Sequence, residues 1–434
     1  MSENLDALRA KIDGIDAEMT RLFEERMKIS AEIGRFKEEN GLPVSDTARE
    51  ADVLYRGAGR LSSPELRPCF YTFQKTLMTL SKELQQQQRQ NARIPAMTIS
   101  SASGRYPVLA GNGLSEHAGE CFALDRRVLV VTDDGVPADY AGRVAGQCGN
   151  PVVYTMKQGE KNKTPDTVLA LCTEMEQSSF DRCDCVIAVG GGIVCDTAGL
   201  AAALYRRGIG FYAIPTTLLA QADASVGGKC GVNWEGIKNL VGTVRAPDGV
   251  LIDPSLLSAL PARELSCGMA ELLKIALCFD GTLFDRLSTV GYGEIPPLDD
   301  ILRAVRLKAD VVEADERESG LRRSLNFGHT VGHAIEELTG GRWHHGECVA
   351  AGMLPFCSEE VLSRLLPCLD ALHLPCVPDV EPERLLPLIR RDKKSENGMI
   401  HVISCDMPGH FSENLMTPEQ ICRKAADTYA RLRN

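Results

Sequence analysis

The 434-residue chain lacks several features that would each define a class of protein. No uninterrupted apolar run approaches the roughly 20 residues that a membrane helix needs, and the charged start, MSENLDALRAKIDG, contains no apolar signal region. No CxxC pair occurs among its 16 scattered cysteines, which predicts buried free thiols in a reducing compartment. A net charge of -11 argues against nucleic acid as a partner. We therefore expect a cytoplasmic globular protein without a membrane segment.

The first 90 residues have a helical pattern. From Leu5 to Phe36 apolar residues recur at spacings of three and four, which predicts one long amphipathic helix whose seam is interrupted by Arg26. A buried arginine requires a partner, an anionic ligand or an exit to solvent. Ser45 or Asp46 can cap a second helix, and a third is expected from about Pro64 to Gln85. Three helices leave a wide apolar seam exposed, so we expect this domain to pack against a second copy.

The remaining chain changes character after a low-complexity linker at residues 91–96. Between residues 97 and 254, short apolar runs alternate with helical segments: RVLVVTDD, CDCVIAVGGG, GIGFYAIPTT and GVLIDP. This alternation predicts a Rossmann-like α/β half with a parallel sheet. From about Ser255 to residue 434 the strand pattern largely stops and helical segments dominate. The expected fold is therefore a three-helix domain followed by an α/β half and a helical half, with the site in the cleft between the halves.

A glycine turn and a polar segment lie in the α/β half. Gly190, Gly191 and Gly192 follow an apolar run and precede a helical segment, an arrangement that suits either phosphate binding or an ordinary tight turn. The segment PTTLLAQADASVGGKCGVNWEGIKNLVG is too polar and glycine-rich to be core alone. Its two lysines and its aspartate favour an anionic, hydroxyl-rich substrate.

Four of the eight histidines fall between residues 329 and 345. If SLNFGHTVGHAIEE is helical, His329 and His333 lie one turn apart on one face. His344 and His345 follow in WHHGE, and Glu271 lies in GMAELLK. A catalytic zinc takes three protein ligands, so these five candidates are more than one site needs. The pattern predicts a metal site and leaves the division of roles open.

Longer motifs carry a resemblance to a family. GGGIVCDTAG, PTTLLAQADASVGGK, GMAELLK, LKADVVEADERESGLRRSLNFGHTVGHAIE, HGE and RDKK occur in the order and spacing of 3-dehydroquinate synthase, over residues 97 to 434. The resemblance implies zinc, with cobalt as a substitute, on Glu271, His329 and His345. His333 would serve as an acid/base residue that contacts the substrate, and His344 would have no direct role.

The resemblance also implies the other ligands of the site. The NAD-binding residues would be Asp133, Glu160, Lys163, Gly191, Gly192, Asp196, Thr216 and Thr217, with Lys238 and Asn239 placed between cofactor and substrate. The substrate contacts would be Arg207, Asp223, Lys229, Lys238, Asn239, Lys274, Lys308, Arg322, Asn326 and Lys393. Of these, Asp223, Lys229, Lys274, Arg322 and Asn326 are expected to take part in catalysis with His333. The lysine of RDKK is assigned to Lys393, with Lys394 as the alternative. Cys230 and Gly231 depart from the threonine and small residue that are common in the family.

The implied reaction is a cycle on 3-deoxy-D-arabino-heptulosonate 7-phosphate. NAD transiently oxidises the C5 hydroxyl, phosphate is eliminated, the ketone is reduced back, and the ring opens and recloses by an aldol step. The lysines and arginines suit a substrate that carries both a carboxylate and a phosphate.

The N-terminal helices resemble a second family. LDALRAKID, EERMKISAEIGRFK, PVSDTARE and LSKELQ are similar to the all-helical chorismate mutases over residues 3 to about 90, which form an intertwined dimer. The resemblance implies a site made of Arg26, Lys37, Asp46, Arg49, Glu50, Ser81 and Gln85, with Arg9 supplied by the partner. The conversion of chorismate to prephenate is a pericyclic rearrangement, so it needs no nucleophile or cofactor. Lys37 and Gln85 would instead stabilise the charge that grows on the ether oxygen in the transition state. Gln85 also opens a glutamine run that suits a linker.

The sequence as a whole predicts a bifunctional enzyme of the shikimate pathway of aromatic amino-acid biosynthesis, a lyase joined to an isomerase. We expect a homodimer or higher homo-oligomer that binds small-molecule substrates. Two alternatives remain. The body can be a related sugar-phosphate cyclase that acts on another heptulose phosphate, or the N-terminal domain can be a sensor of chorismate or prephenate that regulates the synthase.

Overall fold

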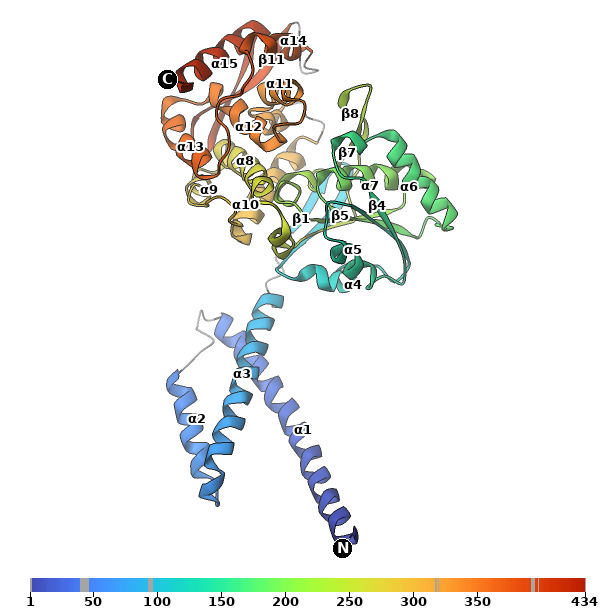
Figure 1. Ribbon diagram of the computed structural model, residues 1–434, viewed down its shortest axis with the longest axis vertical. Helices are drawn as coiled ribbons and strands as arrows, with labels where there is room; N and C mark the ends of the chain where they lie inside the picture. Colours follow the sequence, from blue (N-terminus) through green and yellow to red (C-terminus); the bar gives the residue numbers. More distant parts are fainter. Residues whose placement is uncertain are drawn as a thin grey trace. The chain divides into compact units, whose positions relative to one another are not determined.

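The chain forms two compact units in the computed structural model, Met1–Ile94 (unit 1) and Pro95–Asn434 (unit 2) (Figure 1). The structure describes residues 2–39, 47–92, 97–316, 318, 320–391, 395–396 and 398–433. No helix within these ranges is long and apolar enough to cross a membrane.

Unit 1 contains three long helices, as the sequence predicts. They are α1 (Ser2–Glu39), α2 (Thr47–Gly59) and α3 (Arg67–Ala92), with a short 3-10 turn at Pro64–Leu66. Both α1 and α2 pack against α3. The helix α3 extends past Gln85 into the glutamine run, and the expected caps Ser45 and Asp46 lie outside the described residues.

The apolar seam of α1 is uncovered in the single chain. At 38 residues α1 is about 57 Å long, whereas the 26 residues of α3 span about 39 Å. Leu8, Ile12 and Ile15 are 51%, 57% and 60% exposed. Exposed apolar surface of this extent marks an interaction face.

The α/β half of unit 2 is built on a seven-stranded sheet with the order β1-β2-β9-β6-β5-β3-β4. The strands are β1 (Met97–Ser101), β2 (Gly104–Ala110), β3 (Arg127–Asp133), β4 (Asn150–Met156), β5 (Cys185–Gly190), β6 (Gly210–Pro215) and β9 (Gly249–Ile252). All neighbouring pairs are parallel except β1 with β2. The four runs predicted as strands are β3, β5, β6 and β9, and they are confirmed. Their residues are almost entirely buried, as expected for parallel strands covered on both faces.

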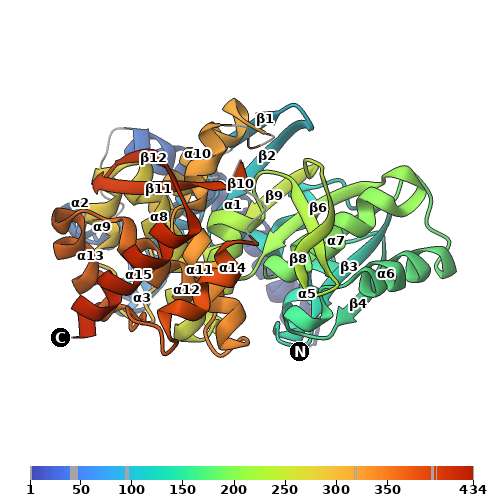
Figure 2. The same ribbon diagram turned by 90° about the horizontal axis from the view of Figure 1, so that it is seen from above.

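Helices cover this sheet and a hairpin projects from it (Figure 2). The helices are α4 (Ala118–Cys121), α5 (Ala138–Ala145), α6 (Pro165–Gln177) and α7 (Gly192–Leu204). The hairpin pairs β7 (Lys229–Trp234) with β8 (Ile237–Val244). The sequence did not predict this hairpin, because nearly all of β8 is exposed and it lacks the buried apolar run of the other strands.

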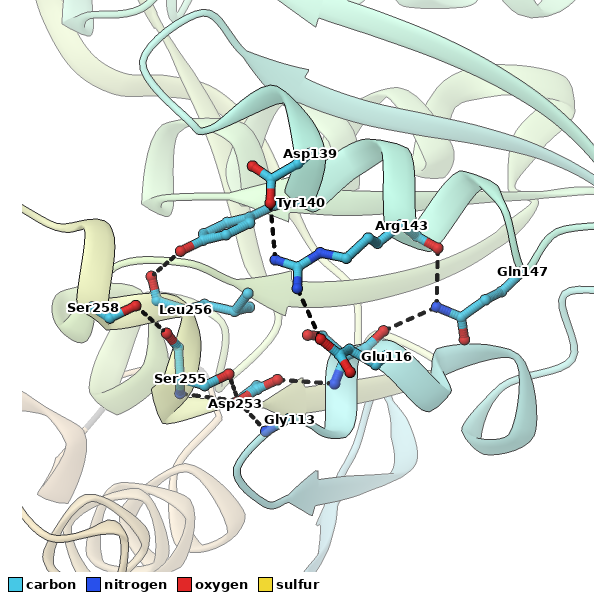
Figure 3. A network of polar contacts seen from close by, with 11 residues as sticks. Gly113, Glu116, Asp139, Tyr140, Arg143, Gln147, Asp253, Ser255, Leu256 and Ser258 are labelled. Carbon is cyan, nitrogen blue, oxygen red and sulfur yellow. Dashed lines mark hydrogen bonds and ion pairs between the residues drawn. The ribbon is translucent and has the colours of Figure 1, made fainter.

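A buried acid at the carboxyl edge of the sheet has a structural role (Figure 3). The Asp253 carboxylate, which follows β9, accepts hydrogen bonds from the backbone N–H groups of Gly113, Ser115 and Ser255 at 2.9, 2.9 and 3.0 Å. It also accepts one from the Ser255 hydroxyl at 2.6 Å. These four bonds satisfy the carboxylate and tie the loops after β2 and β9 together. Asp253 is therefore not a candidate for catalysis.

The helical half begins with α8 and also contains a small sheet. Its helices are α8 (Ala262–Phe279), α9 (Gly281–Leu287), α10 (Leu298–Ala314), α11 (His329–Thr339), α12 (His345–Met353), α13 (Glu359–Ala371), α14 (Leu386–Ile389) and α15 (Pro418–Arg433). The strands β10 (Ser395–Glu396), β11 (Met399–Met407) and β12 (His410–Met416) form an antiparallel sheet. The sequence pattern predicted few strands in this half and did not predict this sheet, because β12 is polar and none of its residues is buried.

The helices α11 and α12 pack backbone to backbone. A Cβ atom added at Gly352 of α12 would lie 2.1 Å from the Gly328 carbonyl oxygen and 2.8 Å from the Gly332 nitrogen. Such a contact cannot be relieved by a side-chain rotation, so glycine at position 352 sets the separation of the two helices.

We predict that Gly352→Ala lowers the free energy of unfolding by about 2 kcal/mol, because the added methyl group forces the two backbones apart. The control is Gly142→Ala in α5, where no atom lies within 4 Å of the added Cβ. That variant should gain about 0.5–1 kcal/mol from helix propensity. Thermal unfolding of both variants measures the difference, and equal midpoints would contradict the close packing.

Candidate active site and metal centre

Three metal-ligand side chains meet in the helical half. Glu271 comes from α8, His329 is the first residue of α11, and His345 is the first residue of α12. The Nε2 atoms of His329 and His345 lie 3.7 and 3.2 Å from Glu271 Oε1, and the three ligand atoms all lie within 4.8 Å of one another. We call these residues the triad.

The predicted helix around the histidines begins later than the sequence suggested. Leu321–Asn326 is a 3-10 helix, and α11 starts only at His329. Between them Gly328 adopts a φ of 77°, a conformation that favours glycine. The break at Gly328 places His329 at the very start of the helix, while His333 still follows one turn later.

Glu271 is a buried carboxylate at the centre of the triad. It is 1% exposed, and Lys274 Nζ, itself 2% exposed, lies 2.5 Å from its Oε2 atom. Burial opposes ionisation of Glu271, but Lys274, His345 and His329 outweigh it and lower its pKa well below the ordinary value. Among the described residues, none donates a well-aligned hydrogen bond to either carboxylate oxygen. An ionised, buried carboxylate that faces two imidazole rings is suited to a divalent cation.

A competing ligand set shares His345 with the triad. His333, Glu336 and His345 also place their ligand atoms within 4.8 Å of one another. Glu336, however, already contacts Lys238 Nζ at 2.6 Å and His345 Nδ1 at 3.5 Å. Burial opposes a charge on His345, but Glu271 and Glu336 outweigh it and raise the pKa of His345 to about 9. The geometry therefore favours the triad, with Glu336 orienting His345 from its other ring nitrogen.

His333 lies beside the triad and is exposed. Its ring centroid is 5.2 Å from that of His329 and 5.9 Å from that of His345. This position lets His333 meet a substrate that contacts the metal.

Three of the residues predicted to contact the substrate are buried cations, and one of them, Lys274, contacts the triad. Lys274, Lys308 and Arg322 are 2%, 6% and 3% exposed. Lys308 Nζ lies 2.7 Å from Asp223 Oδ1, and the Arg322 guanidinium donates to the carbonyl oxygens of Glu316 and Gly227 at 2.7 and 3.3 Å. Buried cations at this density suit an anionic ligand.

Glu318, an acid that no sequence motif singled out, brings Lys229 and Asn326 together. The Glu318 carboxylate accepts hydrogen bonds from both the Lys229 ammonium and the Asn326 amide. Glu318 gave no sequence signal because it is one of several acids in the run VVEADERE.

The predicted NAD residues collect at the carboxyl edge of the parallel strands. Asp133 ends β3, the glycine turn follows β5, and Thr216 and Thr217 follow β6. A Cβ added at Gly190 would lie 2.6 Å from the Val194 side chain, so the turn into α7 requires glycine there. This edge is where open α/β sheets bind their ligands.

Further predicted residues meet at the first turns of α7. Lys163 Nζ donates to Asp196 Oδ2 at 2.5 Å and to Asn239 Oδ1 at 2.7 Å. Burial raises the pKa of Asp196, and Lys163 opposes that rise. Glu160 Oε1 accepts a hydrogen bond from the Asn233 amide of β7 at 2.8 Å. The hairpin thus forms one wall of this region.

The hairpin also joins the two halves of unit 2. Lys238 of β8 contacts Glu336 of α11, and Glu336 contacts His345. No sequence motif singled out Glu336, although its position three residues after His333 places it on the same helical face.

Arg207 stands apart from this assembly. Arg207 is exposed at the end of α7 that is opposite the glycine turn, and the 13 residues of α7 span about 20 Å. The structure therefore does not bring Arg207 to the triad within one chain. Lys393 and its alternative Lys394 lie outside the described residues.

In unit 1 the structure joins two of the predicted mutase residues. Arg26 Nη1 donates to Ser81 Oγ at 2.5 Å and to the Leu77 carbonyl oxygen at 3.2 Å. Burial lowers the pKa of Arg26. Among the described residues no carboxylate pairs with Arg26, so its charge is available to an anion.

The structure describes only some of the other residues that were predicted for the mutase site. Arg9 pairs with Asp6 at 3.3 Å and lies 17 residues, about 26 Å, from Arg26 along α1. Lys37 is partly buried on α1, and Arg49 of α2 pairs with Asp52 at 3.1 Å. Asp46 and the side chains of Glu50 and Gln85 lie outside the described residues.

These features are those of an enzyme. Unit 2 has an α/β half and a helical half, and the helical half contains the triad of metal-ligand side chains. Family models match as 3-dehydroquinate synthase N-terminal at residues 153–267 and 3-dehydroquinate synthase C-terminal at residues 268–395. A third, chorismate mutase type II, matches residues 8–86.

Individual relatives agree with the family models. A 3-dehydroquinate synthase of Symbiobacterium thermophilum is 41% identical over 340 residues, which cover 73% of this chain and 94% of the relative. A 2-epi-5-epi-valiolone synthase of Streptomyces hygroscopicus, solved with NAD+ and Zn²⁺, is 30% identical with a TM-score of 0.69 over 75% of this chain and 97% of its own. A 2-deoxy-scyllo-inosose synthase, solved with carbaglucose-6-phosphate, NAD+ and Co²⁺, is 25% identical with a TM-score of 0.69 over 77% and 99%.

The chain belongs to the 3-dehydroquinate synthase family and carries a type II chorismate mutase domain at its N-terminal end. It is a two-domain enzyme, and the fusion that the sequence motifs indicated is confirmed.

We predict that Asp223→Asn destabilises the fold by about 3 kcal/mol, because it leaves the buried Lys308 ammonium without its carboxylate. Burial opposes ionisation of Asp223, but Lys308 and Lys274 hold its pKa below the ordinary value. The stabilisation is therefore present above the ordinary pKa and is lost as the pH falls through the lowered one. Urea unfolding at neutral pH measures it. The control Asp134→Asn, whose exposed partner is Lys157, should change little.

Proposed function

We propose that unit 2 converts 3-deoxy-D-arabino-heptulosonate 7-phosphate to 3-dehydroquinate and phosphate with the help of NAD and zinc. The observation that carries this proposal is the buried, ionised Glu271, which lies beside His329 and His345 and pairs with the buried Lys274. The family supports the substrate, since its 3-dehydroquinate synthase members align along nearly their whole length.

The triad would hold the metal, which supplies Lewis-acid polarisation of substrate oxygens. Three protein ligands leave the remaining coordination for substrate, as in catalytic zinc sites. Relatives solved with Zn²⁺ and with Co²⁺ support a divalent cation, and cobalt is the expected substitute for zinc.

NAD would lie along the carboxyl edge of the sheet and supply reversible hydride transfer. The N-terminus of α7, preceded by the glycine turn, would receive the pyrophosphate. Asp133, Glu160 and Asp196 offer acceptors for hydroxyl groups, and Thr216 and Thr217 offer hydroxyl groups of their own.

The chain's own side chains would bind and orient the substrate. Lys274, Lys308 and Arg322 offer charge-assisted donors to carboxylate and phosphate oxygens in a buried setting. Lys229 and Asn326 would exchange their bonds to Glu318 for bonds to the substrate. His333, exposed beside the triad, would hold or transfer a proton at a substrate oxygen.

A related sugar-phosphate cyclase activity is the second candidate for unit 2, since two such enzymes share its fold. Their identities of 25% and 30% are lower than the 41% shared with a 3-dehydroquinate synthase. Phosphate release from each heptulose phosphate would separate the two activities.

We predict a division of labour between the two histidines of α11. His329→Ala should lose the metal of the triad, because it removes a ligand. His333→Ala should keep that metal and lose turnover by about 100-fold or more, because it removes a proton-transfer group. Elemental analysis and phosphate release measure the two effects. His410→Ala, at an exposed position of β12, is the control that should keep both. Equal metal loss in the His329 and His333 variants would refute the assignment.

For unit 1 we propose an active chorismate mutase that works as an intertwined dimer. The uncovered seam of α1 supports the dimer. Arg9 lies too far along α1 to reach a ligand held by Arg26 of its own chain, so it would act in the partner's site. Arg26, without a carboxylate partner among the described residues, would bind a carboxylate of chorismate.

A regulatory role for unit 1 is the alternative, because chorismate and prephenate are both dicarboxylates that suit the same arginines. A sensor would bind them without turnover and would change the kinetics of the synthase.

We predict that Arg26→Ala abolishes conversion of chorismate to prephenate by the full-length protein, because it removes the buried guanidinium. Arg21→Ala is the matched control on the same helix, since Arg21 is exposed and pairs only with Glu18 and Glu25 among the described residues. Conversion is followed by the loss of chorismate absorbance. Saturable chorismate binding without conversion in the unmodified protein would make unit 1 a regulator.

A further inference from the structure

A second group of metal-ligand side chains lies at the start of α8 and α12. Glu264, Cys267 and His344 place one ligand atom each within 4.8 Å of one another. His344 Nδ1 lies 2.9 Å from Glu264 Oε1, and Cys267 is 2% exposed beneath them. No role in the synthase reaction accounts for this combination of a carboxylate, a thiol and an imidazole.

We propose that Glu264, Cys267 and His344 form a second binding site for zinc or a similar divalent cation. Carboxylate oxygen, thiolate sulfur and imidazole nitrogen are the three ligand types that zinc prefers. A carboxylate, a thiolate and an imidazole together carry two negative charges, which balance the two positive charges of the ion. Glu264 and His344 are 40% and 34% exposed, so the ion can enter from solvent and keep a water ligand.

The backbone around the group is held in place before any ion binds. A Cβ added at Gly346 would lie 2.3 Å from the Cys267 carbonyl oxygen, so α12 packs directly on α8 at this point. Glu347 accepts hydrogen bonds from Arg263 at 2.6 and 2.7 Å and from the His344 backbone N–H at 2.7 Å. This bridge neutralises the charge of Arg263, the cationic residue that directly precedes Glu264 in the sequence. The ligands therefore lie on two elements whose separation is fixed.

Cys267 is the ligand whose protonation state must change when an ion binds. Burial, with help from Glu264 and Glu347, raises the pKa of Cys267, so the thiol is protonated at neutral pH in the absence of a cation. Binding would displace that proton, as it does for other thiolate ligands. Affinity for the ion should therefore increase with pH.

The location couples the second site to the triad. Cys267 precedes Glu271 by four residues, one turn of α8, and His344 directly precedes His345. An ion bound to Glu264, Cys267 and His344 would clamp the ends of the two helices that carry two ligands of the triad. The second site would then stabilise the arrangement of the catalytic metal centre without contacting the substrate.

Cobalt provides the test, because a thiolate ligand gives Co²⁺ a near-ultraviolet charge-transfer band and the triad contains no cysteine. The full-length chain is stripped with a chelator, reloaded with Co²⁺ and dialysed, and its cobalt content and absorption are measured. We expect about two ions per chain and a charge-transfer band. Cys267→Ser should lose the band and one ion, and Glu264→Gln should weaken both. His329→Ala should lose one ion and keep the band.

Two exposed thiols serve as controls. Cys69→Ser and Cys183→Ser should leave the band and the cobalt content unchanged. Absence of the band in the unmodified protein, or a band that survives Cys267→Ser, would overturn the proposal. So would a single ion that His329→Ala removes entirely. Because the band reports only on sulfur ligation, failure of this proposal and failure of the triad assignment give different results.

Discussion

A carboxylate that is 1% exposed must be compensated by its neighbours, and the packing of α12 against both α8 and α11 provides part of that compensation for Glu271. Lys274 lies one turn further along the same helix, and the two imidazole rings come from the first residues of the other two helices. These positions depend on the glycine contacts that let the helices approach so closely. A small increase in helix separation would move the two imidazole rings away from the carboxylate, whereas Lys274 would stay beside it on α8.

The same requirement links the helical half to the α/β half. Lys238 of the hairpin pairs with Glu336, which contacts His345, while the adjacent Asn239 accepts a hydrogen bond from Lys163. The hairpin thus contacts both the predicted metal region and the predicted NAD region. Two consecutive residues of β8 make these contacts.

Sequence patterns predicted what depends on local periodicity and on specific motifs. The strands β3, β5, β6 and β9 are continuous apolar runs because both of their faces are buried, and α1 has a clear helical period. The sheet β10-β11-β12 and the hairpin were missed because their exposed strands carry mixed residues. Glu318 and Glu336 were missed because an acid in a charged segment becomes distinctive only when folding places it beside a lysine or a histidine. The break at Gly328 was missed because it depends on a backbone conformation.

The buried cations of the two units have different kinds of partner, and this difference affects how each unit can bind an anionic ligand. In unit 2 the buried lysines each face a carboxylate, so the resting site is balanced, and a substrate must compete with Asp223, Glu271 and Glu318 for its cations. Among the described residues of unit 1, a hydroxyl and a carbonyl oxygen hold Arg26. Neutral acceptors orient the guanidinium without cancelling its charge, so an incoming carboxylate gains most of the available interaction. A site for a dicarboxylate that needs no cofactor therefore requires little more than fixed, unneutralised cations.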